Sequence, residues 1–313
     1  MKNIITLTVN PAVDKSTRIN GLQPDRKLRG STPVLEPGGG GINVSRAIHK
    51  LGGSSACLYV AGGCRGKQLH ELLDEESIEQ HVVECPDETR ENFMVFDEAN
   101  RQQYRFITNG PPMAPEIWQK SLDLLDTLVG ADDYVVASGS LSPGMPSDYY
   151  AQVTKLGRAK GAKMIVDTSG EALRQAVGAG VFLLKPNLGE LSALTSQRAI
   201  TAPEQEHLAQ QLVDQQQAEV VVVSLGAQGA MLVTAAGVTY VAAPTVPKKT
   251  TVGAGDSMVA GMVLCLAQGW ELAEAVRYGV ACGTAATMNH GTQLCHKEDV
   301  EELYRWMQQR TKP

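Results

Sequence analysis

The stretch Thr251–Gly261 places a glycine-rich turn directly before a carboxylate. Gly253, Ala254 and Gly255 precede Asp256, and the apolar residues that follow predict a helix beginning at Asp256. Glycines let the backbone turn tightly and come close to a ligand. The first turn of a helix leaves amide groups unpaired and carries the positive end of the dipole, so it suits an anion. This loop is therefore predicted to hold a phosphoryl group.

A carboxylate beside an anion site is electrostatically unfavourable, which indicates a chemical role for Asp256. A base that takes a proton from an attacking hydroxyl belongs at this place, while the loop holds the group being transferred. The alternative is an Asp that caps the helix after an ordinary glycine turn. The loop alone favours the cap, and the other motifs of the chain reverse that preference.

Two further motifs accompany the loop. Four consecutive glycines, Gly38–Gly41, come just before a predicted helix that holds Asn43. They are expected to bring backbone amides close to a ligand, the alternative being a flexible hinge. The amide of Asn43 both donates and accepts hydrogen bonds, as a polyol requires. Asn187 and Glu190 share one face of a first helical turn, where they either orient magnesium-bound water or form a capping box.

The strands in the second half predict an α/β sheet with ligands at one edge. From residue 115 onward helical and extended patterns alternate regularly, which favours a mostly parallel sheet. The strand at 220–223 is wholly apolar, as a central strand would be, and the turn Ser224–Gly229 after it could border a nucleotide. The turn 138–144 is rich in small and hydroxyl residues and reaches the same type of edge.

Charge and composition limit the classes of function. The chain of 313 residues has a net charge of −6, which argues against nucleic-acid and anionic-membrane binding. Phosphate substrates would need local positive charge, and Arg90 and Arg105, on the two strands of a hairpin predicted at 89–108, supply it together with Lys27 and Arg29. Each is alternatively a solvated surface charge. Six scattered cysteines and the lack of a signal or membrane-spanning segment predict a cytoplasmic protein.

The order and spacing of these motifs resemble those of the ribokinase-type carbohydrate kinases. The resemblance rests on Gly38–Val44, on Lys185-Pro186-Asn187-x-x-Glu190 and on Gly253–Asp256, and it covers almost the whole chain. Within the family, Gln103–Phe106, Val166–Leu173 and Thr251–Met258 are similar to the minor bacterial 6-phosphofructokinases. The related 1-phosphofructokinases and tagatose-6-phosphate kinases typically have Lys where this chain has Gly40.

The resemblance implies an α/β fold of ribokinase-like type. This is a three-layer αβα sandwich with a mostly parallel central sheet in one domain, 1–313. A β lid from about 12–36 and 87–110 would pair with the lid of a second subunit in a homodimer. The implied reaction transfers the ATP γ-phosphoryl group to the 1-hydroxyl of fructose 6-phosphate. Tagatose 6-phosphate or fructose 1-phosphate as the sugar, and a non-catalytic sensor, are the alternatives.

The resemblance also assigns roles to individual residues. Asp256 would be the base, with Gly253, Ala254 and Gly255 as the anion hole. The sugar phosphate would be bound by Asp14, Lys27 (from the partner's lid), Gly39, Asn43, Arg90, Arg105 and Ser140. ATP would be bordered by Lys185, Asn187, Ser224, Gly226 and Gly229, and Glu190 would help to place Mg²⁺.

A monovalent cation is expected next to the loop. Many members of the family have Asp at the position of Thr250, and that Asp often helps to bind the cation. In this chain K⁺ could still bind through carbonyl oxygens, with Thr250, Val252, Ala286, Asn289 and Gly291 as the expected ligands.

Overall fold

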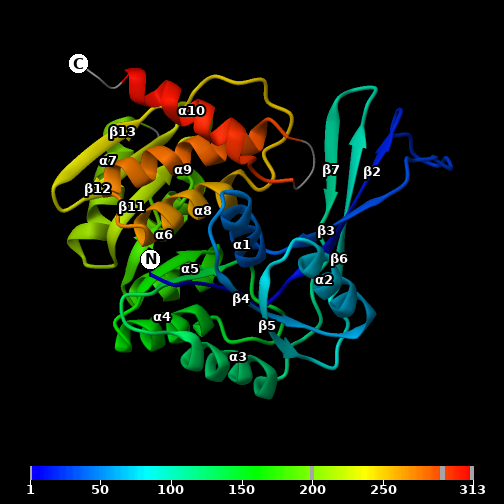
Figure 1. Cartoon of the computed structure of the whole chain (residues 1–313), viewed down its shortest axis with the longest axis horizontal. Coiled ribbons are helices and arrows are strands. Elements are labelled where there is room, and N and C mark those ends of the chain that lie inside the picture. The colour runs from blue at the N-terminus through cyan, green and yellow to red at the C-terminus, as the bar shows by residue number, and fades with distance from the viewer. Residues whose placement is uncertain (1, 198–200, 290–292, 311–313) are drawn as a thin grey trace.

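The structure is a computed structural model that describes residues 2–197, 201–289 and 293–310. Its larger part is a nine-stranded sheet between two layers of helices, and a second sheet of four strands projects from one side (Figure 1). No helix in these described ranges is long and apolar enough to cross a membrane.

The large sheet is parallel except at one edge. Its strand order is β13-β12-β11-β10-β9-β8-β1-β4-β5, and only β12 and β13 pair antiparallel to their neighbours. The bounds are β1 Ile4–Thr8, β4 Ala56–Ala61, β5 Glu79–Glu84, β8 Tyr134–Ser138, β9 Lys163–Asp167, β10 Val181–Leu184, β11 Ala218–Ser224, β12 Ala230–Thr234 and β13 Gly237–Val241. All of β1 and β8 is buried, as expected of strands covered on both faces. The predicted mostly parallel sheet is confirmed.

Helices cover both faces of this sheet. One layer packs around the apolar helix α8, and the other packs on the opposite face. The first layer holds α1 Gly40–Lys50, α2 Gly63–Glu75, α8 Ala254–Ala267, α9 Leu272–Thr287 and α10 Lys297–Arg310; the second holds α3 Pro115–Leu128, α4 Tyr149–Ala159, α5 Gly170–Gly178, α6 Leu188–Thr195 and α7 Ala202–Asp214. The helix α8 is buried from Ser257 to Ala267, and its half-buried first turn lies at the carboxyl edge of the sheet.

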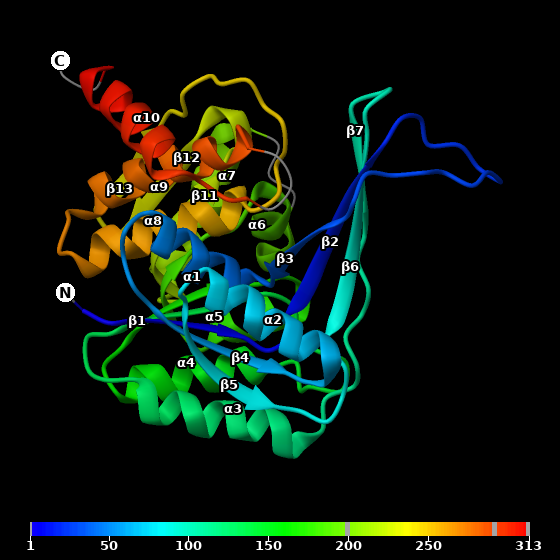
Figure 2. The same cartoon turned by 45° about the vertical axis from the view of Figure 1, so that its right-hand side comes forward.

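The second sheet has the order β3-β2-β6-β7 and extends away from the helical layers (Figure 2). It is formed by β2 Ala12–Ile19, β3 Val34–Gly38, β6 Arg90–Asp97 and β7 Gln102–Phe106, so the predicted hairpin is present as β6 and β7. Large apolar side chains remain exposed on it, including Val34 at 57%, Phe106 at 54% and Ile107 at 54%. A single chain therefore leaves apolar surface of this sheet uncovered.

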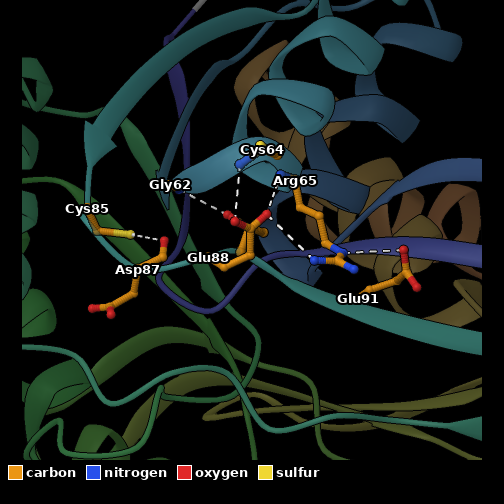
Figure 3. Close-up of polar contacts among 8 residues, drawn as sticks. Gly62, Cys64, Arg65, Cys85, Asp87, Glu88 and Glu91 are labelled. Atoms are coloured by element: carbon orange, nitrogen blue, oxygen red, sulfur yellow. Dashed lines mark hydrogen bonds and ion pairs between the residues drawn. The ribbon is translucent and has the colours of Figure 1, made fainter.

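The carboxylate of Glu88 holds the segment before β6 against the start of helix α2. The Oε2 atom of Glu88 accepts a hydrogen bond from the amide of Cys64 at 3.2 Å, and its Oε1 atom accepts one from Arg65 at 2.6 Å (Figure 3). These bonds satisfy the free amides at the start of α2, which begins at Gly63 and not at the predicted Gln68. The segment that leads into β6 is thereby held against α2.

One helix was missing from the sequence-based expectations. Residues 170–178 form α5, which packs against β9 and β10 and buries Leu173, Ala176 and Val177. Its nine residues offer little more than two turns of apolar periodicity, so the pattern is weak without the sheet that it covers.

Candidate active site

The glycine-rich loop has the geometry of an anion site. Gly253 is the N-cap of α8 and has φ 71°, in the left-handed region where glycine is favoured. A Cβ at this position would lie 2.6 Å from a methyl group of Leu294. Within the described part of the chain no side chain caps the helix, so its first amides face the loop. The helix begins at Ala254, two residues before the predicted start.

Asp256 is the third residue of α8, so the alternative that it caps the helix is wrong. Its carboxylate is half-buried, and the Oδ2 atom accepts a hydrogen bond of 2.9 Å from Nδ2 of Asn43. Burial raises the pKa of Asp256 to about 7, and the negative charge of Asp167 raises it further, while Asn43 and Lys185 act in the opposite direction. A carboxyl group with this pKa can exchange a proton near neutrality.

The remaining polar atom of Asn43 points to a ligand. The side chain is 7% exposed, and its Oδ1 atom is buried with no hydrogen-bond partner in the part of the chain that the structure describes. Buried acceptors are rarely left unpaired in native proteins. Since Nδ2 already donates to Asp256, the free Oδ1 is placed to accept a hydrogen bond from a hydroxyl beside that carboxylate.

A buried ion pair lies on the other side of the loop. The Nζ atom of Lys185 is 3.6 Å from Oδ2 of Asp167, and a Cβ at Gly255 would lie 3.3 Å from the same Nζ. Burial alone would lower the pKa of Lys185, but the carboxylates of Asp167, Glu190 and Asp256 together raise it. The lysine is therefore a charged group beside the anion loop. Asp167, at the end of β9, received no role in the sequence reasoning.

The glycine run is packed tightly, which rules out the hinge. Gly39 has φ 123°, and a Cβ there would lie 2.7 Å from Cγ2 of Thr8. At Gly40 a Cβ would lie 2.1 Å from Oγ of Ser138 and 2.9 Å from the amide nitrogen of Gly139. These glycines let the start of α1 approach the ends of β1 and β8, which brings Asn43 to Asp256.

The second sheet contributes a cluster of polar residues. Asp14, 8% exposed, accepts a 2.8 Å hydrogen bond from Nδ2 of Asn92. Burial raises the pKa of Asp14, and the charges of Arg90 and Arg105 oppose that shift. Arg90 donates to the carbonyl oxygens of Asn10 and Thr108, at 2.9 Å each. The structure thus brings Asp14, Arg90 and Arg105 together, and it adds Asn92, which follows Arg90 by two residues and shares its face.

The other two predicted sugar-binding side chains, Ser140 and Lys27, are exposed in the single chain. Ser140 is exposed, and its Oγ atom accepts a 3.2 Å hydrogen bond from Nδ2 of Asn10. Lys27 is exposed in the connection between β2 and β3, which projects away from the large sheet (Figure 2). The structure of one chain therefore does not bring Lys27 to Asp256.

A cavity of about 400 Å³ opens beside the anion loop. The predicted ATP-binding residues Ser224, Gly226 and Gly229 border it, and so do Ala254 and Gly255. Most of its exposed lining is apolar, as an adenine ring requires. No sequence motif indicated the rest of the wall, which includes Ala243, Pro244, Thr245, Val246, Lys248, Met258, Val280 and Thr284.

Asn187 and Glu190 form a complete capping box at the start of α6. The amide of Glu190 donates to Oδ1 of Asn187, and the amide of Asn187 donates to Oε2 of Glu190, both at 2.9 Å. The capping alternative is therefore confirmed. The site lies next to the cavity, because Asn187 bridges to Ser224. Oxygen ligands of this kind suit Mg²⁺.

Most of the residues expected to bind K⁺ lie near the end of α9. The amides of Lys249 and Thr250 both donate to the carbonyl oxygen of Thr287, at 2.8 and 3.2 Å. This brings Thr250 and Val252 to Ala286 and Asn289, where the negative end of a helix dipole favours a cation. Gly291 lies outside the described residues. The described ranges hold no group of three His, Cys, Asp or Glu that could bind a metal ion.

An anion loop with a carboxylate at its edge, a cavity beside it and a second sheet that carries arginines are the parts found in a small-molecule kinase. The chain belongs to the pfkB family of carbohydrate kinases, whose model matches residues 4–299.

The chain is similar to proteins of this family over its whole length. It is 44% identical over 310 residues to the ATP-dependent 6-phosphofructokinase isozyme 2 of Escherichia coli K12, with 98% of this chain and 99% of the relative covered. The structure of phosphofructokinase-2 from E. coli in complex with potassium matches it with a TM-score of 0.95 at 41% identity, covering 98% of this chain and all of the other. Ribokinase from Thermotoga maritima, at 20% identity and a TM-score of 0.78, covers 97% of this chain and shares the fold. The predicted ribokinase-like fold is confirmed.

Proposed function

We propose that the protein transfers the γ-phosphoryl group of ATP to the 1-hydroxyl of fructose 6-phosphate. The observation that carries the proposal is the position of Asp256. Its carboxylate lies in the first turn of α8, is bonded to Asn43 and has a pKa raised to about 7. A sugar hydroxyl that accepts a phosphoryl group from the loop would meet a proton acceptor at this point.

The other residues position the reactants. The nucleotide lies in the cavity at Ser224, Gly226 and Gly229, and its terminal phosphate meets the loop amides and Lys185. Asp256 accepts the proton of the attacking hydroxyl while Oδ1 of Asn43 holds a hydroxyl of the sugar. When bound, Mg²⁺ would neutralise phosphate charge, with Glu190 and Asn187 orienting its water. K⁺ would bind through the carbonyl oxygens near Thr250 and stabilise the loop.

The second sheet is the lid over the sugar phosphate. Asp14, Gly39 and Ser140 bind sugar hydroxyls, and Arg90 and Arg105 bind the 6-phosphate. Because the guanidinium of Arg90 already bonds two carbonyl oxygens, Arg105, which is exposed, supplies the larger part of the binding charge. The E. coli phosphofructokinase-2, at 40% identity, has been solved in complex with fructose 6-phosphate, which supports this choice of sugar.

Gly40 distinguishes this chain from the classes of kinase that use the alternative sugars. The 1-phosphofructokinase of Bacillus subtilis is 32% identical to this chain, and the tagatose-6-phosphate kinase of Staphylococcus epidermidis is 28% identical. Both identities are lower than the 44% shared with the 6-phosphofructokinase isozyme 2 of Escherichia coli. A Lys at position 40, typical of those two classes, would place its Cβ 2.1 Å from Oγ of Ser138. The close packing at position 40 therefore fits glycine and not the Lys of those two classes.

The exposed apolar residues of the lid support a homodimer. Phe93 and Phe106 lie side by side at 6.4 Å between ring centroids, and both are exposed in the single chain. Pairing two lids would cover them and bring Lys27 to the partner's site. Light scattering should give the mass of a dimer or of a larger assembly of dimers, and Phe106→Glu should lower it. An unchanged mass in that variant would exclude the lid as the interface.

The products of the reaction test the proposed function. With Mg-ATP and fructose 6-phosphate, ³¹P NMR should show ADP and a sugar with a second phosphate on carbon 1. Binding of both ligands without ADP formation would support the non-catalytic sensor. Phosphorylation at another carbon would contradict the orientation of the sugar.

A further inference from the structure

One hydrogen bond joins the second sheet to the segment before the anion loop. The Oγ1 atom of Thr250 donates to Oε1 of Gln103 at 3.3 Å, across 147 positions of the sequence. Thr250 is 6% exposed, and its Oγ1 atom also accepts a hydrogen bond of 3.1 Å from the amide of Val252. The side chain of Gln103 thus reaches a hydroxyl that shapes the backbone directly before Gly253.

Gln103 shares its strand and its face with a residue of the sugar-phosphate site. It lies on β7 two positions before Arg105, and alternate residues of a strand point to the same side. Opposite them on β6, Phe96 pairs with Gln103 and Met94 pairs with Arg105. The Nε2 atom of Gln103 contacts Sδ of Met94 at 3.7 Å, which holds the amide in its orientation.

The loop side of this contact is also held in place. The amide of Thr250 donates to the carbonyl oxygen of Thr287 at the end of α9, and α9 packs along α8. A small cavity of about 100 Å³ lies between the two parts, bordered by Met94, Gln103, Lys249 and Thr250. Because this cavity leaves the contact incompletely packed, the hydrogen bond between Gln103 and Thr250 is a specific connection between the second sheet and the loop.

We propose that Gln103 is a positioning residue that aligns the anion loop with the sugar-phosphate site. This inference rests on the proposed function. When a sugar phosphate holds Arg105, the rigid spacing of β7 fixes Gln103, which in turn fixes Thr250 and the turn into Gly253. Binding of the sugar then orders the amides that receive the phosphoryl group.

Kinetics of matched variants test the link. Gln103→Leu removes the acceptor, whereas Gln103→Glu keeps an acceptor for the Thr250 hydroxyl. We expect Gln103→Leu to lower kcat about three- to tenfold, the effect of one hydrogen bond, with little change in the KM for ATP. Gln103→Glu should retain most of the activity. The control is Gln102→Leu, on the opposite face of the same strand, which should behave as wild type.

A double variant tests whether the two residues act as one unit. Thr250→Val also removes the acceptor for the amide of Val252, so it should reduce kcat at least as much, and Gln103→Leu combined with Thr250→Val should be no slower than Thr250→Val alone. Multiplying effects would show that the residues act independently and would overturn the proposal.

Amide hydrogen exchange gives a readout that does not depend on turnover. Fructose 6-phosphate should slow exchange at residues 250–255 in the wild type and in Gln102→Leu, but not in Gln103→Leu, although that variant still binds the sugar. Equal protection in all three proteins, or none in the wild type, would contradict the coupling. Protection in a wild type that forms no ADP would leave the coupling standing and refute the proposed function.

Discussion

Replacing Asp256 by Asn is expected to lower kcat at least about 10²- to 10⁴-fold, the range for loss of a general base. The amide has almost the same shape and cannot accept the proton of the sugar hydroxyl. Steady-state ADP release at saturating ATP and fructose 6-phosphate measures the effect. Because Asp256 lies beside Asn43 and not inside the nucleotide cavity, calorimetry should find ATP binding largely retained.

The pH profile separates this role from a structural one. The pKa of Asp256 is raised to about 7, and a base works in its deprotonated form, so kcat/KM should rise tenfold per pH unit below about pH 7 and level off above it. The residual kcat/KM of Asp256→Asn should not show this rise with pH. Asp123→Asn, an exposed carboxylate on α3, is the control. Near-normal turnover in Asp256→Asn would remove the residue from catalysis.

Replacing Arg105 by Ala should mainly weaken the use of the sugar phosphate. A lost charged hydrogen bond is worth about 1.5–3 kcal/mol, so kcat/KM for fructose 6-phosphate should fall roughly ten- to a hundredfold. The KM for ATP should change little, because the nucleotide cavity is lined by other elements. Varying each substrate at a fixed concentration of the other gives both constants.

A second arginine of the lid serves as the matched control. Arg101 lies at the tip of the hairpin with φ 57°, a backbone conformation that Asn tolerates. Arg101→Asn removes the same charge from the same sheet and should leave both KM values near those of the wild type. A loss of ATP affinity without loss of sugar affinity in Arg105→Ala would contradict its assignment.

Local patterns in the sequence were enough to predict the main elements of the fold. The apolar run at 220–223 indicated a buried strand, and β11 is buried along nearly its whole length. The glycine loop indicated a helix start, and Gly253 needs its glycine because of both its φ and the nearby Leu294. The spacing of Asn187 and Glu190 allowed a capping box, which is present. Such features depend on a few neighbouring residues and can be read from them.

The site was harder to predict where it depends on contacts between distant segments. Asp167 acts on Asp256 only because β9 ends beside the loop, and Asn92 acts on Asp14 only through the pairing of β2 with β6. Asp167 lies inside the motif Val166–Leu173, but that motif indicated no role for it, and Asn92 stands in no motif. The start of α2 also differs from its predicted position, because its first amides are satisfied by Glu88 from the segment before β6.

The most direct test of the account is the comparison of kcat/KM for fructose 6-phosphate, tagatose 6-phosphate and fructose 1-phosphate with Mg-ATP, each measured by ADP release. We expect a clear preference for fructose 6-phosphate, because Gly40 stands where the kinases that use the other two sugars typically have Lys. A higher kcat/KM for either other sugar would contradict the proposed substrate while leaving Asp256 as the base. No ADP with any of the three would contradict the proposed reaction itself.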